Sequence, residues 1–108
     1  MIVLYGSRKI EDKQQIFKIS VNKILNKNQI PYFTGVGDLL AAMLLVHEEK
    51  FEDDFGKIIE YAVNIVNSVI QNSIRFPIMG KDEISLIASK NDIEFPRIRI
   101  KGEYILNY

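Results

Sequence analysis

Apolar residues recur with a helical period in the second half of the chain. Between residues 55 and 74 they are spaced three and four positions apart, which predicts a long helix with one broad face packed inward. The acids at positions 52–54 directly precede this pattern and suit the positive end of a helix dipole. The opposite face is predicted to meet water and carries polar residues: Lys57, Glu60, Asn64, Asn67 and Asn72.

Three other segments have the pattern of strands. Met1–Tyr5 is a continuous apolar run, which predicts a strand buried on both faces. Ile16–Val21 alternates apolar and polar residues, and Arg97–Lys101 alternates isoleucine with charge, so each predicts a strand with one wet face. The charged segment Arg8–Lys13 predicts a solvated turn between the first two strands.

Residues 32–45 read Tyr-Phe-Thr-Gly-Val-Gly-Asp-Leu-Leu-Ala-Ala-Met-Leu-Leu, and they predict a loop that enters a buried helix. His47 follows this run and is predicted to be a surface residue at the helix end. A short helix over Asp82–Ser89 and a connector over Asp92–Pro96 complete the pattern. A few strands with two long helices and a short one favour the α/β class.

Composition limits the chain to one folded unit and excludes several functions. Its 108 residues, 47% of them hydrophobic, suit a single domain spanning 1–108. Fourteen basic and fourteen acidic residues balance, so no net field favours nucleic acid as a partner. No apolar run suits a membrane span or a signal peptide, and we expect a cytoplasmic protein that does not bind membranes. The absence of cysteine excludes thiolate metal sites, and the acids near residue 52 predict a solvated turn, so no metal ligand is assigned.

The tetrapeptide Gly35-Val36-Gly37-Asp38 is the candidate site for chemistry. The first N–H groups of a helix have no partner within the helix and attract anions, and glycine lets a phosphate approach the backbone. A carboxylate beside such a site makes sense if it orients an attacking hydroxyl and receives its proton while the amides stabilise the transferred phosphoryl group. Taken alone, the same residues also suit an ordinary turn and helix cap.

Three blocks of the sequence resemble one enzyme family. Residues 32–45 resemble the anion-hole motif of the pyridoxal kinases, a branch of the ribokinase superfamily. Residues 83–96 resemble the C-terminal segment of that family, and residues 2–8 resemble the strand before its nucleotide-binding region. The resemblance implies the C-terminal part of a three-layer α/β/α ribokinase-like fold. It also implies ATP-dependent phosphoryl transfer to the hydroxymethyl group of pyridoxal, which forms pyridoxal 5′-phosphate in vitamin B6 salvage.

The same resemblance implies roles for individual residues. Asp38 corresponds to the catalytic base. The anion hole corresponds to Gly35, Val36 and Gly37, where Val36 replaces a threonine of the animal enzymes and leaves the backbone donors intact. The positions that the family places along ATP are Gln29, Ile30, Pro31, Phe33, Val36 and Ile70.

The implied ligands are ATP with Mg²⁺ or another divalent cation, and pyridoxal with related B6 vitamers. A monovalent cation is a further candidate cofactor of the complete enzyme, which is expected to be a homo-oligomer, a dimer in this family. Family members are much longer than this chain, and their pyridoxal pocket, lid and metal-holding acids lie upstream. We therefore expect an incomplete kinase domain that is inactive alone.

Two alternatives stay open. One is a kinase like the related hydroxymethylpyrimidine kinases, against which the ending Asp-Ile-Glu-Phe-Pro at 92–96 argues. The other is a non-catalytic remnant whose exposed sheet edge drives self-association or pairing with a missing portion.

Overall fold

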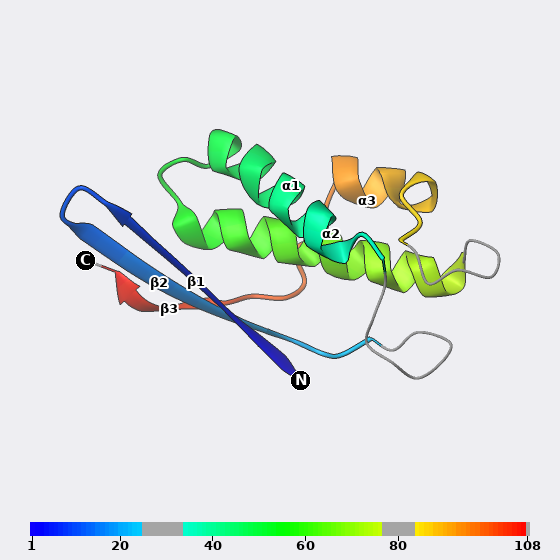
Figure 1. The fold of residues 1–108 in the computed structure, drawn as a ribbon, viewed down its shortest axis with the longest axis horizontal. Coiled ribbons are helices and arrows are strands. Elements are labelled where there is room, and N and C mark those ends of the chain that lie inside the picture. Colours follow the sequence, from blue (N-terminus) through cyan, green and yellow to red (C-terminus); the bar gives the residue numbers. More distant parts are fainter. Residues whose placement is uncertain (25–33, 77–83, 108) are drawn as a thin grey trace.

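A sheet and a set of helices form two layers in the protein (Figure 1). The structure is a computed structural model that describes residues 1–24, 34–76 and 84–107. The described residues are of mixed α/β class, as predicted, and are compatible with part of a ribokinase-like fold. The elements in chain order are β1 (Ile2–Ile10), β2 (Lys13–Val21), α1 (Val36–Lys50), α2 (Phe55–Arg75), the 3₁₀ turn η1 (Ile87–Ser89), α3 (Lys90–Glu94) and β3 (Glu103–Asn107).

The sheet has three antiparallel strands in the order β1-β2-β3. β1 pairs with β2 from Ile2 opposite Val21 to Ile10 opposite Lys13, so the hairpin turns at only two residues. The prediction of a first strand buried on both faces is wrong, because β1 is an edge strand in which Tyr5 is 64% exposed. The predicted turn over Arg8–Lys13 is likewise mostly strand, since a tight hairpin needs fewer residues than the charged segment contains.

The predicted strand at Ile16–Val21 is confirmed and lies within β2. Phe17 and Ile19 are buried against α2, in a core that also contains Phe55, Ile59 and Val63. A second cluster joins α1 to α2 through Leu39, Ile65, Val66 and Val69.

The last strand does not lie where the sequence predicts it. Arg97–Lys101 is not a strand, and β3 begins at Glu103. The reason is Asn64, whose Oδ1 accepts hydrogen bonds from the N–H groups of Arg99 (3.0 Å) and Ile100 (2.9 Å). Its Nδ2 donates to the Ile100 carbonyl (2.8 Å). The Asn64 side chain therefore occupies the backbone hydrogen-bonding groups that would otherwise pair with a neighbouring strand. Asn64, which was predicted to face water, is buried.

The predicted long helix is confirmed as α2. It begins after Asp54, whose side chain accepts a hydrogen bond from the Lys57 N–H (3.1 Å). The Tyr104 hydroxyl of β3 accepts a hydrogen bond from the Gly56 N–H (2.8 Å), and the Tyr104 ring packs edge-on against Phe17. These contacts fix the start of α2 on the sheet. No helix in the described ranges is long and apolar enough to cross a membrane.

The helix α1 is only partly buried, contrary to the prediction. Its burial follows one face: Leu39 is buried, whereas Leu45 is 70% exposed. His47 is not a surface residue as predicted, because it is only 4% exposed and its Nδ1 lies 2.8 Å from the Met43 carbonyl oxygen. The His47 ring packs against the rings of Phe51 and Tyr61. The rings of Phe51 and Tyr61 thus cover His47, although a position in the last turn of a helix predicts an exposed side chain.

The segment before β3 also departs from the expected pattern. Residues 82 and 83 of the predicted short helix lie outside the described residues, and of the rest only Ile87–Ser89 is helical, as η1, which leads directly into α3. α3 covers residues predicted to be a connector. Asn72 of α2 holds this segment by donating to Ser89 Oγ (3.2 Å) and Asp92 Oδ2 (2.7 Å).

Candidate active site at the start of helix α1

The start of α1 requires glycine at position 35. Gly35 has φ 98° and ψ −4°, a left-handed conformation that side chains rarely adopt. A Cβ atom there would lie 3.2 Å from the Ile84 side chain. The tight turn that aims the first turn of α1 therefore depends on this residue type.

The first backbone amides of α1 are donors that make no hydrogen bond within the helix. The Leu39 N–H makes a helical hydrogen bond to the Gly35 carbonyl (3.0 Å). The N–H groups of Val36, Gly37 and Asp38 come before it and have no acceptor one turn earlier in the helix. They also lie at the positive end of the helix dipole, which favours an anion. Gly35 has no side chain with which to cap them.

Gly37 and Asp38 are exposed at this helix start. A Cβ atom at Gly37 would find no atom within 4 Å, so the space beside its backbone is open. Asp38 contributes a carboxylate in the same first turn. An anion held by the amides would thus be near a group that accepts a proton.

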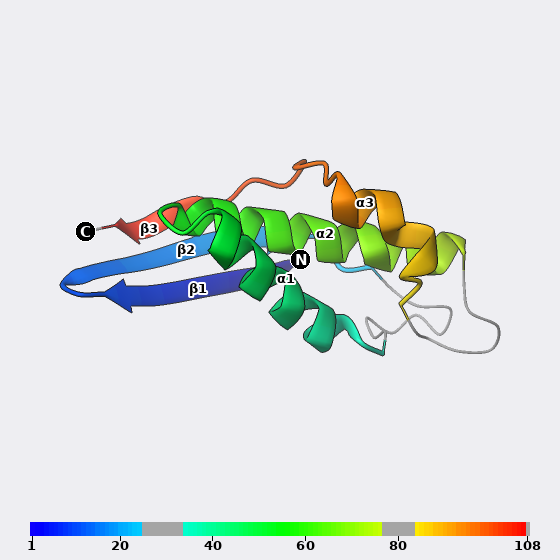
Figure 2. The same cartoon turned by 90° about the horizontal axis from the view of Figure 1, so that it is seen from above.

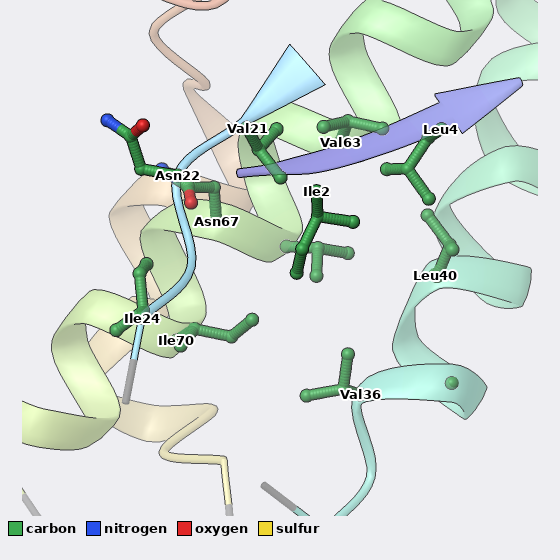
Figure 3. Close-up of a pocket in the computed structure, with 12 residues that line it drawn as sticks. Ile2, Leu4, Val21, Asn22, Ile24, Val36, Leu40, Val63, Asn67 and Ile70 are labelled. Carbon is green, nitrogen blue, oxygen red and sulfur yellow. The ribbon is translucent and has the colours of Figure 1, made fainter. Parts of the chain in front are cut away.

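A cavity of about 380 Å³ adjoins the helix start (Figure 3). Its walls come from β1, the end of β2, and helices α1 and α2, and they are mostly apolar. The lining residues are Ile2, Leu4, Val21, Asn22, Ile24, Val36, Gly37, Leu40, Val63, Val66, Asn67 and Ile70.

The structure brings some of the sequence-predicted site residues together around this cavity. Val36 and Gly37 line it, as does Ile70 from the next helix. Asp38 belongs to the same turn but is not one of the lining residues. Four predicted ATP-binding residues lie outside the described part of the chain: Gln29, Ile30, Pro31 and Phe33.

Two polar residues that line the cavity are not predicted as site residues from the sequence. Asn22 follows β2, and Asn67 lies on α2, where its polarity suggested a water-facing position. Asn67 is three residues before Ile70 and one after Val66, so it lies at the border of the apolar face. That border position was the available signal. Carboxamides at the wall of an apolar cavity can both donate and accept hydrogen bonds to a ligand.

The described residues do not supply a metal centre. Within 1–24, 34–76 and 84–107, no three acidic or histidine side chains come close enough to hold an ion. No metal-dependent step is therefore assigned to the side chains of this part of the chain.

The described residues form an α/β protein whose helix-covered sheet is compatible with part of a ribokinase-like fold. Curated proteins similar to this chain are pyridoxal kinases. Pyridoxal kinase from Arabidopsis thaliana is 33% identical over 95% of this chain and 35% of its own length. The enzyme from Dictyostelium discoideum is 32% identical over 94% of this chain and 36% of its own length, and that from Ovis aries is 31% identical over 65% and 26%.

The chain therefore spans about a third of the length of the curated relatives it matches first. No protein-family profile matches it. The similarity is that of a portion of a pyridoxal kinase, and it is consistent with the C-terminal portion that the motifs indicate.

Proposed function

We propose that this chain carries the anion hole and the catalytic base of an ATP-dependent pyridoxal kinase. The observation that supports the proposal is the start of α1, where three amides outside the helical ladder adjoin an apolar cavity and a carboxylate. This helix start occurs in a chain about a third identical to pyridoxal kinases over nearly its whole length.

The reaction requires positioning and charge stabilisation more than covalent chemistry by the protein. The hydroxymethyl oxygen of pyridoxal attacks the terminal phosphorus of ATP, and the bond between that phosphorus and the ADP oxygen breaks. The amides of Val36, Gly37 and Asp38 stabilise the charge on the transferred group. The Asp38 carboxylate orients the hydroxyl group and receives its proton. Pyridoxal 5′-phosphate and ADP are the products.

The cavity offers a place for the base of the nucleotide. In Figure 3 one end of the cavity lies between Ile24 and Ile70, near Asn22 and Asn67. Apolar walls suit the faces of a flat heterocycle, and the Asn67 carboxamide suits its polar edge, whereas the Asn22 carboxamide points away from the cavity in Figure 3. A volume of about 380 Å³ falls within the range of roughly 300–1,000 Å³ typical of ligand sites.

The pyridoxal pocket, the lid and the metal-holding acids are assigned to the portion of the relatives that this chain does not span. Mg²⁺ or another divalent cation would accompany ATP and neutralise phosphate charge when bound. We infer that the 108-residue chain alone does not phosphorylate pyridoxal, and that the complete enzyme is a cytoplasmic dimer.

The test uses this chain mixed with a separately produced polypeptide comprising the part of the Arabidopsis thaliana enzyme that this chain does not match. We expect ATP-dependent phosphorylation of pyridoxal by the mixture and none by either part. Asp38→Asn should lower kcat by about 10²–10⁴-fold, the usual contribution of a general base. Glu48→Gln, a matched change at an exposed carboxylate on the same helix, should leave kcat unchanged.

Three results would count against the proposal. Activity of an Asp38→Asn mixture equal to that of the unmodified mixture would remove Asp38 from the chemistry. Faster phosphorylation of hydroxymethylpyrimidine than of pyridoxal would assign the chain to the alternative kinase. Phosphorylation by the chain alone would overturn the inference that it is incomplete as a catalyst.

A further inference from the structure

The turn that precedes α1 does not fix its own shape. Gly35 has φ 98°, but glycine adopts positive and negative φ about equally well, so this residue type permits the left-handed turn without enforcing it. The start of α1 also has no side-chain cap. The direction of the first amides of α1 therefore depends on contacts that neighbouring segments make with the turn.

Ile84 makes two such contacts. Its N–H donates a hydrogen bond to the carbonyl of Thr34, the residue directly before Gly35 (3.2 Å). Its side chain occupies the space beside Gly35, where a Cβ atom would lie 3.2 Å from it. In Figures 1 and 2 residues 84–89, in yellow, lie beside the start of α1 and the C-terminal part of α2. This segment therefore connects α2 to the turn.

Ile84 is itself held through the next residue. The backbone at both positions belongs to no helix or strand. The Ser85 N–H donates to Oγ of Ser73 on α2 (2.8 Å), and the Ser73 hydroxyl donates to the Val69 carbonyl one turn earlier (2.7 Å). The Ser85 hydroxyl adds a hydrogen bond to the Phe76 carbonyl (2.6 Å). Ser73 and Ser85 are only 3% and 6% exposed, so water does not replace the Ser73 acceptor when it is removed.

We propose that Ser73 is a positioning residue of the site, whose hydroxyl holds the turn before α1 in place through Ser85 and Ile84. A shift of Ser85 would move Ile84 and loosen its contacts with that turn. The amides at the start of α1 would then point less well at the transferred phosphoryl group, and a misplacement of about 1 Å costs up to about 100-fold in rate. This inference rests on the proposed function, because it takes those amides to be the anion hole.

The first experiment measures backbone hydrogen exchange in the 108-residue chain alone. With Ser73→Ala, the amides of Ile84 and Leu39 should exchange at least about tenfold faster, because these N–H groups donate to the carbonyls of residues 34 and 35 (3.2 and 3.0 Å). Asn64→Ala is the matched control, because Asn64 lies on the same helix, is 4% exposed and also holds a distant segment. It should change both rates less than about twofold. Circular dichroism verifies that each variant is folded.

The second experiment measures kcat and KM of the mixture with the unmatched part of the Arabidopsis thaliana enzyme. Ser73→Ala should lower kcat about tenfold and change the KM for pyridoxal less than about twofold, because the amides act on the transition state. Ser73→Thr keeps the hydroxyl and should restore kcat. Ile84→Ala, at a partly buried position, should lower kcat in the same way as Ser73→Ala. Asn64→Ala should leave kcat unchanged.

The outcomes separate this inference from the proposed function. Unchanged exchange at Ile84 and Leu39 in Ser73→Ala would overturn the inference, as would an active mixture whose kcat neither Ser73→Ala nor Ile84→Ala lowers. An equal loss of kcat in Asn64→Ala would also overturn it, since lost stability alone would then account for the effect. Faster exchange in Ser73→Ala together with an inactive unmodified mixture would refute the proposed function and support the link from Ser73 to the turn.

Discussion

Replacing Gly37 by alanine should separate the stability of the fold from the function of the site. Gly37 is the second residue of α1, and a Cβ atom built there meets nothing within 4 Å. Its backbone is not left-handed, unlike that of Gly35. Alanine loses less backbone freedom in a helix than glycine, so the free energy of unfolding should rise by up to about 0.5–1 kcal/mol.

The same methyl group should weaken nucleotide binding. Gly37 lines the cavity, and its amide is one of the three donors at the helix start. A methyl group beside that amide keeps a phosphate from approaching as closely as it does over glycine. The alanine keeps the N–H donor but holds the phosphate away from it. Loss of one well-placed donor costs about 3 kcal/mol of transition-state stabilisation, so kcat/KM should fall by up to about 100-fold.

The assay combines urea unfolding of the chain with ATP titration and kinetics of the reconstituted mixture. Gly56→Ala serves as the contrasting control, because its Cβ atom would lie 2.7 Å from the Phe17 ring and should destabilise the fold. If the Gly37→Ala chain is less stable than the unmodified one, the space beside the Gly37 backbone is not open as the structure shows. An unchanged ATP affinity and kcat/KM would refute the anion hole.

The remaining predictions concern stability and ligand binding. Gly35→Ala should lower the free energy of unfolding by about 1–2 kcal/mol in urea melts, because alanine at φ 98° is strained. Asn64→Ala should lower it by about 2–3 kcal/mol, because it leaves the N–H groups of Arg99 and Ile100 without their acceptor. Asn67→Ala should change the unfolding midpoint little yet reduce ATP affinity of the mixture by titration calorimetry, and equal affinities would exclude Asn67 from the nucleotide site.

Elements whose stability is encoded nearby in the sequence were predictable. The apolar period of α2 and the acid that caps it lie within one segment, and the alternation of Ile16–Val21 shows directly which side chains of β2 face the core. These elements formed where the pattern placed them. Their partners in space did not need to be known.

Positions decided by distant contacts were not predictable from the pattern. Asn64 has the composition of a wet helix face, but it is buried because residues 99 and 100 present backbone groups to it from 35 and 36 positions away. His47 lies in the last turn of α1, where its polarity predicts exposure, yet Phe51 and Tyr61 cover it. In both cases a partner elsewhere in the chain reverses what polarity and local position indicate.

The candidate site likewise has one part that local sequence predicts and one part that depends on distant contacts. The half proposed to bind an anion consists of consecutive backbone amides. It is predictable because a left-handed glycine at 35 and a helix beginning at 36 are local properties. The apolar half combines walls from two strands and two helices, and no segment of sequence contains that arrangement. The chemistry proposed for Asp38 therefore depends on both halves, because the local helix start supplies the donors and only the folded chain assembles the apolar walls.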